Sequence, residues 1–364
     1  MSNTYALKYC METAVKKQKE GRQFWIDLCR GVGILFVLLG HTDLPKTLYR
    51  LVYGFHLPLF FILSGYLFCA ANHNELPLKD YIKKLVRSYL FPYFVLCGIN
   101  LILSFLGHFA GIIKDFSFSR YLRGIIIYSW GTREWLPNCS PLWFLTCLFC
   151  ALVLFYWIMH CKNWIVRILL VLLCVGTSYV LDLLDAPKLY WNTDSAMMAV
   201  VFLAIGALLY DYSFLDAFNR LKALSCGLIC VGCAILGGIA IYINRNVSFN
   251  FNEYGNLPLM LIGATLMCFS VIQFCIMISG INTRNPITAF TSKVGKHTLL
   301  IMGFDYFAWG LVSFVTDRWY FEFPLKCLIL LIIGFVYLMT IRYTKKWKNK
   351  ICFEFLAIVG VHKK

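Results

Sequence analysis

The sequence is poor in charged residues, and in acidic residues above all. Asp and Glu contribute 18 of its 364 residues, and all charged residues together make up only 14%. Soluble domains carry about 25% charged residues. This scarcity, with 60% hydrophobic residues and a mean hydropathy of +0.70, excludes an ordinary soluble protein. The chain is therefore an integral membrane protein.

Internal repeats, low-complexity tracts and a soluble appended domain are also missing. We expect one membrane domain at 24–343, preceded by a cytoplasmic segment at 1–23 and followed by a basic cytoplasmic tail at 344–364.

The 16 cysteines do not form a recognisable metal-binding pattern. Most lie inside apolar runs, including Cys147 with Cys150 and Cys230 with Cys233, and no second pair or His cluster follows at zinc spacing. We interpret them as small side chains that face lipid or neighbouring helices, and we expect no metal.

Long apolar runs recur along the chain, and each is close to the length that crosses a bilayer. They lack the polar alternation of membrane strands, so we predict an all-α, polytopic helical bundle of about ten transmembrane helices. The runs lie at 24–42, 48–70, 89–109, 142–160, 165–184, 195–210, 224–243, 257–279, 298–315 and 325–343.

Most of the 34 Lys and Arg residues fall on one side of these runs, including Lys16, Lys17, Lys19 and Arg22 before the first. Cytoplasmic loops carry such an excess, so we predict that both termini are cytoplasmic. No small-residue cleavage site follows the first run, which we take as a retained helix. The net charge of +16 is then a topology signal, and no nucleic-acid partner is expected. The exception is the outer segment 110–141, whose piece "YLRGIIIYSW" is expected to lie along the surface or re-enter.

The first run places charged and titratable groups inside an apolar helix, in the stretch "RGVGILFVLLGH". Arg30 and His41 return to nearly the same helix face after three turns, about 16 Å along the axis. Asp27 joins that face. A charge at mid-bilayer costs about 3 kcal/mol, so this stripe is expected to face the protein interior. The alternative is that Arg30 snorkels with Asp27 as its partner while His41 is interfacial.

The second run opens with "FHLPLFFILSGYLF", which places His56 near the same outer hairpin as His41. Ser64 and Gly65 follow, and small residues of this kind allow close approach of helices in a membrane.

These two stretches together carry a resemblance to a known family. "WIDLCRGVGILFVLLGH" followed by "FHLPLFFILSGYLF" resembles the first two helices of the acyltransferase-3 family of membrane acyltransferases, and particularly its fucose 4-O-acetylase-like branch. Arg30 and His41 meet the family pattern of Arg, ten residues, His. "KKLVRSYLFPYF", "PLWFL" and "GKHTLLI" extend the resemblance over the whole chain. One departure is Asp305, which stands where many relatives have a His.

The resemblance implies transfer of an acyl group, usually acetyl from acetyl-CoA, to a hydroxyl of a cell-envelope glycan or glycolipid in the bacterial inner membrane. His41 suits the removal of the hydroxyl proton because an unperturbed His has a pKa of about 6.5. An acyl-imidazole intermediate is the alternative. We expect Asp27 to hold Arg30, whose charge would stabilise an anionic donor group or a developing oxyanion. His56 is a further catalytic candidate whose role stays open.

The donor is polyanionic, so its phosphates need cations at the inner mouth. Lys83, Lys84 and Arg87 resemble the basic donor site of the family, and ordinary positive-inside anchoring is the alternative reading. Ser64 is a candidate for contact with the acyl carrier, or for helix packing. Trp143 is a candidate for stacking on the acceptor sugar, or for an interfacial aromatic belt.

Two other functional classes remain open. A secondary transporter also buries charge in such a bundle, but it is expected to show repeated halves with broken helices, and none are found. A non-catalytic membrane component of a polysaccharide-assembly complex would not depend on His41. In chemistry, the hydrophobic acyltransferase family with a single membrane His is a nearer rival, and it lacks the paired motifs.

Overall fold

The computed structural model describes residues 24–111, 116–128, 140–244, 246–281, 285–313, 315, 316 and 318–337. Within these ranges the chain is helical, and the β structure amounts to one isolated bridge between Ser248 and Glu253. This confirms the all-α prediction. The predicted terminal segments 1–23 and 344–364 lie outside the described residues, as does much of 110–141.

Within the described part, the first helix covers residues 24–40 and the last covers Trp319–Tyr337. The helices between them are α2 (Lys46–Ala70), α3 (Leu78–Leu85), α4 (Phe91–Phe109), α5 (Phe118–Arg123), α6 (Trp143–His160), α7 (Trp164–Leu183), α8 (Thr193–Asp211), α9 (Phe214–Asn219), α10 (Ala223–Ile243), α11 (Leu257–Ile281), α12 (Pro286–Lys296) and α13 (Thr298–Val312). Among the described residues, eight helices are long and apolar enough to cross a membrane. Each of the ten predicted runs overlaps a helix, so the protein is a multi-pass helical bundle.

Several boundaries differ from the sequence prediction, and the helical span that contains α4 begins at Leu78 instead of 89. The helix α13 has 15 residues and ends at Val312. The last helix begins at Trp319, ahead of the predicted start at 325, and it includes Glu322 and Lys326. The predicted run left Glu322 outside the span, and here Glu322 and Lys326 are both buried with partners. Lys326 is therefore a residue of the bundle interior.

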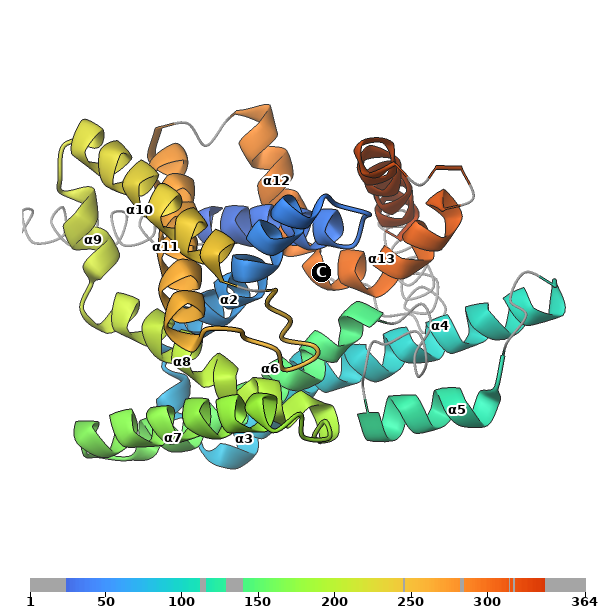
Figure 1. The fold of residues 1–364 in the computed structure, drawn as a ribbon, viewed down its shortest axis with the longest axis horizontal. Helices are drawn as coiled ribbons and strands as arrows, with labels where there is room; N and C mark the ends of the chain where they lie inside the picture. The colour runs from blue at the N-terminus through green and yellow to red at the C-terminus, as the bar shows by residue number, and fades with distance from the viewer. Residues whose placement is uncertain are drawn as a thin grey trace, which may run out of the picture.

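The middle of the bundle is α2, with α10 and α11 on one side and α4 and α5 at the opposite end (Figure 1). Close approach of α2 and α8 depends on two glycines. A Cβ at Gly65 would lie 2.0 Å from the carbonyl oxygen of Leu203, and one at Gly206 would lie 2.0 Å from that of Ile62. The expected packing role of the small residues in the second run is thus confirmed at Gly65.

A second close crossing joins α12 to the first helix. A Cβ at Gly295 would lie 1.8 Å from the carbonyl oxygen of Asp27, and one at Gly31 would lie 2.0 Å from that of Thr291. Only residues without a side chain permit this approach. The crossing brings Lys296, at the end of α12, beside the charged residues of the first helix.

The short piece "YLRGIIIYSW" begins as α5 and continues as one π-helical turn over Gly124–Tyr128. It packs on α4, where Tyr93 donates a hydrogen bond of 3.0 Å to the carbonyl oxygen of Ile125. Tyr121 and Ile125 are buried in this contact region.

Candidate active site

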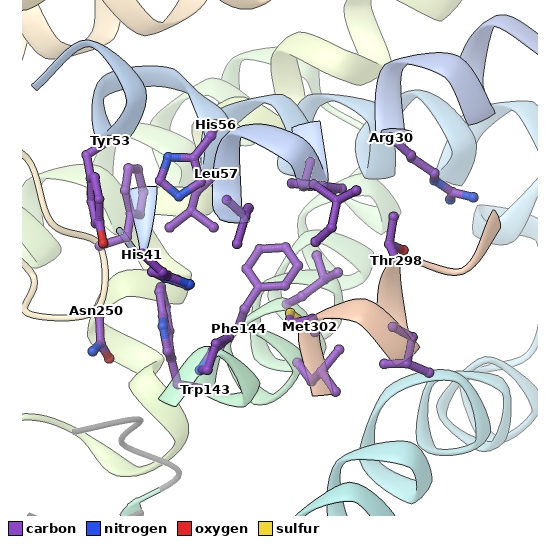
Figure 2. Close-up of a pocket in the computed structure, with 18 of the residues that line it drawn as sticks. Arg30, His41, Tyr53, His56, Leu57, Trp143, Phe144, Asn250, Thr298 and Met302 are labelled. Atoms are coloured by element: carbon purple, nitrogen blue, oxygen red, sulfur yellow. The ribbon is translucent and has the colours of Figure 1, made fainter. Parts of the chain in front are cut away.

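A cavity of about 400 Å³ lies between the first helix, α2, α6 and α13. Figure 2 shows Arg30 and Thr298 at one end and His41, His56 and Asn250 at the other. We name these the Arg30 end and the His41 end. Arg30 and His41 therefore line one interior space, as their shared helix face predicted.

His41 follows the last turn of the first helix, where its backbone N–H bonds the carbonyl oxygen of Val37 at 3.2 Å. Its Nδ1 hydrogen-bonds the carboxylate of Asp305 on α13. A carboxylate only accepts, so Nδ1 carries a proton, and in the neutral form of the ring the lone pair is on Nε2. Tyr306 packs edge-on against the ring, with centroids 5.6 Å apart. The ring is therefore fixed in both tautomer and orientation.

Asp305 is paired in turn with Lys326 of the last helix. Lys326 Nζ lies 2.6 Å from Asp305 Oδ1, and both side chains are 0% exposed. The same ammonium donates to the carbonyl oxygen of Leu38 at 3.1 Å. A buried charge without a partner is strongly unfavourable, so each of these two ions requires the other. Three helices are thereby joined at the base of the His41 ring.

Glu322 supports the same corner from one turn earlier in the last helix. It is buried, and its Oε2 accepts a hydrogen bond of 3.2 Å from the backbone N–H of Asp43. Asp43 stands two residues after His41. The last helix therefore positions the His41 ring through the pair of Lys326 with Asp305, and it also binds the backbone that follows His41 through Glu322.

Asp305 and Lys326 were missed as site residues by sequence reasoning. Their signal was available, because each is a charged residue inside an apolar stretch, "LLIMGFDYF" and "FPLKCLIL". Their pairing with each other and with His41 was not available, since 264 positions separate His41 from Asp305.

His56 lies at the His41 end of the cavity, as expected for two residues flanking one hairpin (Figure 2). Its side chain is buried, and Nδ1 donates to the carbonyl oxygen of Val52 at 2.7 Å. The ring of Tyr53 packs edge-on at 5.1 Å. With Nδ1 protonated, the neutral His56 ring offers Nε2 as a hydrogen-bond acceptor.

The Arg30 end is built from exposed and loosely paired charges. Asp27 lies 3.9 Å from the Arg30 guanidinium and 3.7 Å from the Lys296 ammonium. The Arg30 side chain is 37% exposed and the Lys296 side chain 59%. Asp27 is beside Arg30 as predicted, and one carboxylate shared by two cations leaves this end positive.

Hydroxyl groups complete the Arg30 end. Ser88, Tyr89 and Thr298 line the cavity there, and Thr298 is the first residue of α13. Ser64 also lines the cavity, and its hydroxyl donates to the carbonyl oxygen of Phe60 at 2.7 Å. Ser64 therefore stands at the cavity wall with its proton already engaged.

The three basic residues predicted for the donor are exposed, and they do not line this cavity. Lys83 and Lys84 belong to α3, and Arg87 to the π-helical turn that follows it. Lys84 Nζ is hydrogen-bonded to His73 Nε2. Burial, with the Lys84 charge in second place, lowers the pKa of His73 to about 4, so this imidazole is a neutral acceptor. Arg87 directly precedes Ser88 of the cavity wall.

Trp143 is the first residue of α6 and lines the His41 end, where its side chain is 6% exposed. It packs edge-on against Phe144, with ring centroids 6.3 Å apart. A tryptophan of an interfacial belt presents its ring to headgroups, whereas this ring forms part of an interior wall.

Comparison with known proteins gives one family. Residues 23–301 match the family model described as an acyltransferase domain, the model of acyltransferase-3. The matched range includes His41, His56 and Arg30, and it ends before Asp305 and Lys326. No curated protein and no solved structure matches the chain.

Proposed function

We propose that this chain, which belongs to the acyltransferase-3 family of membrane acyltransferases, is an O-acetyltransferase. It moves an acetyl group from acetyl-CoA to a hydroxyl of a cell-envelope glycan or glycolipid. The observation that carries the proposal is the His41 ring, held by a buried carboxylate with Nε2 available in a cavity. We further place it in the fucose 4-O-acetylase-like branch and in the bacterial inner membrane, on the paired helix motifs alone.

His41 acts as the general base. Nε2 takes the proton of the acceptor hydroxyl while the oxygen attacks the thioester carbonyl, so that a C–O bond forms and the C–S bond breaks. The imidazolium then returns the proton to the leaving thiolate, and His41 is regenerated. Asp305 stabilises the imidazolium and keeps Nδ1 protonated throughout, as a buried carboxylate does in hydrolytic triads.

Arg30 and Lys296 serve the donor. Arg30 lines the cavity and Lys296 is joined to it through Asp27, and charge-assisted hydrogen bonds from such cations bind phosphate. Thr298 and Ser88 add hydroxyl groups at the same end. The acyl-bearing arm would run from this end toward His41, so donor and acceptor would approach from opposite ends of one cavity.

His56 and Trp143 serve the acceptor. His56 Nε2 is a neutral hydrogen-bond acceptor beside His41, suited to a second hydroxyl of a sugar. Trp143 supplies an aromatic face in the same wall. A largely apolar pocket with a few polar groups placed to fix orientation is the ordinary design of a small-molecule site.

The test compares wild type with His41→Ala in lipid discs, using acetyl-labelled acetyl-CoA and a cell-envelope glycan extract. Label on the glycan and release of CoA are measured. We expect His41→Ala to reduce both glycan labelling and CoA release at least about 1000-fold, because the substitution removes the general base. His160→Ala is the matched control, because His160 lies on α6, does not line the cavity, and donates from Nδ1 to the carbonyl oxygen of Tyr156 in its own helix.

Normal transfer by folded His41→Ala would overturn the assignment. Folded wild type that neither releases CoA nor labels glycan would favour the transporter or scaffold readings.

A further inference from the structure

The described segment 246–256 between α10 and α11 forms one wall of the His41 end. Ser248, Phe249, Asn250 and Phe251 line the cavity there. Ser248 and Glu253 pair through two backbone hydrogen bonds of 2.8 and 2.9 Å, which close a tight turn. Asn252 takes a left-handed backbone conformation, with φ of 54°, which Asn tolerates better than most residues. The turn thus places four consecutive side chains at the cavity.

Buried polar contacts fix this turn to α7. Asn252 Nδ2 donates to the carbonyl oxygen of Ser178 at 3.1 Å, and its Oδ1 accepts from the Ser178 hydroxyl at 3.0 Å and from the Tyr254 hydroxyl at 2.8 Å. All three residues are buried. A satisfied buried network of this kind rigidifies the segment that it anchors.

The N-terminal part of α8 holds the cavity-facing residues themselves. Ser195 donates a hydrogen bond to the carbonyl oxygen of Phe249. Asn192 Nδ2 donates to the carbonyl oxygen of Asn250 at 3.3 Å. The backbone of Asn250 is therefore tied down on both sides of its side chain.

Within the described segment 246–256, one buried side-chain oxygen is left without a partner. Asn250 Oδ1 is shielded from solvent and makes no hydrogen bond within the described part of the chain. Figure 2 shows the Asn250 side chain at the His41 end, near His41 and Trp143. An unpaired buried acceptor costs about 1–3 kcal/mol. A rigid turn that keeps such an atom in a residue lining the cavity indicates a ligand that supplies the proton.

We propose that Asn250 Oδ1 accepts a hydrogen bond from a hydroxyl of the acceptor, next to the hydroxyl that His41 deprotonates. This assignment rests on the proposed function and deepens it, because it names a residue that selects the acceptor. The ligand class is a neutral polyhydroxylated ring, whose O–H groups fill the acceptor and whose apolar face meets Phe249 and Trp143. A site built to bond a hydroxyl discriminates strongly against the analogue that lacks it.

The experiment uses the full-length protein in lipid discs with acetyl-CoA and a set of methyl hexopyranosides with their monodeoxy analogues. Acetyl transfer to each sugar is measured for wild type, Asn250→Leu and Asn250→Asp. Asn246→Leu is the matched control, since Asn246 is exposed on the same segment, accepts from Arg50 at 3.0 Å and does not line the cavity.

We expect Asn250→Leu to lower kcat/KM for the sugar about 10- to 100-fold, while the KM for acetyl-CoA stays within about twofold. With wild type, one monodeoxy analogue should show a kcat/KM lower than that of the parent sugar by the same factor. With Asn250→Leu, the same analogue and the parent sugar should have equal kcat/KM. Asn250→Asp keeps the accepting oxygen and should retain discrimination against that analogue, which separates a binding role from misfolding.

Wild-type sugar kinetics in Asn250→Leu, or an equal loss for every monodeoxy analogue, would overturn the assignment while the proposed function stands. Release of CoA by wild type without acetylation of any sugar would overturn the ligand class. No turnover of acetyl-CoA by folded wild type would defeat the proposed function, and this inference with it.

Discussion

The two ends of the cavity use charge in opposite ways. At the His41 end, Asp305 and Lys326 are 0% exposed and 2.6 Å apart. At the Arg30 end, Asp27 is 3.9 Å from a guanidinium that is 37% exposed and 3.7 Å from an ammonium that is 59% exposed. The first pair is buried and short, and the second is open and loose.

This difference fits two tasks. A reacting base gains from groups that are already in place, because no reorganisation is then needed during the reaction. A mouth that admits a flexible polyanion gains from long, mobile, solvated cations, which attract the ligand without fixing it. We therefore expect substitutions at the His41 end to lower kcat and the stability of the fold. Substitutions at the Arg30 end should instead raise the KM for the donor.

Asp305→Asn should have the largest effect. The amide would donate to His41 Nδ1 and so favour the tautomer with the proton on Nε2, which removes the base. The comparable change in a hydrolytic triad lowers kcat by about 10,000-fold, and we expect about 1000-fold or more here. Steady-state CoA release in the presence of a glycan acceptor measures it, with Asp185→Asn, an exposed residue outside the cavity, as the matched control. Retention of a tenth of wild-type kcat would show that Asp305 does not position the base.

Lys326→Met should show the coupling of this end to folding. The substitution leaves Asp305 as a buried charge without its partner, which costs about 3–5 kcal/mol in comparable cases. We expect a lower unfolding temperature in lipid discs and a fall in kcat. Asp305→Asn combined with Lys326→Met removes both charges, so it should regain stability and remain inactive.

The double variant also contains the counter-test. If it is no more stable than Lys326→Met alone, the 2.6 Å pair does not govern the stability of this corner. If it regains activity as well, the pair is a structural feature without a part in catalysis.

The two ends also differ in how far the sequence predicts them. Arg30 and His41 share a helix, so the period of 3.6 residues per turn was enough to place both on one interior face. His56 follows from the short hairpin after His41. Asp305 and Lys326 could be marked as charges in apolar runs, but their partners come from packing of helices far apart in the sequence. Asn250 stands in an irregular segment with no period at all, so only the folded turn reveals it.

The pattern of charges in the sequence led to the prediction of Lys83, Lys84 and Arg87 as donor-binding residues. Such an argument finds the basic end of a helix, but it does not show which cations line a cavity. The structure places Lys296 beside Asp27 through the glycine crossing of α12, and no local signal in "GKHTLLI" indicates that contact. Donor binding by the three predicted residues stays a prediction.

Arg30→Gln should have the smallest effect on folding, and it tests the role assigned to the Arg30 end of the cavity. We expect the KM for acetyl-CoA to rise about 10-fold, and about threefold for Lys296→Gln, whose side chain is more exposed and better screened. Raising NaCl from about 50 to about 500 mM should increase the wild-type KM and increase that of Arg30→Gln less, because the variant has fewer phosphate contacts to screen.

The response of kcat then decides between the two roles open to this guanidinium. An unchanged kcat at saturating donor means that Arg30 binds an anionic group of the ground state. An equal loss in kcat and kcat/KM means that its charge acts on the developing oxyanion, and the Arg30 end would then share in the chemistry that we assign to the His41 end.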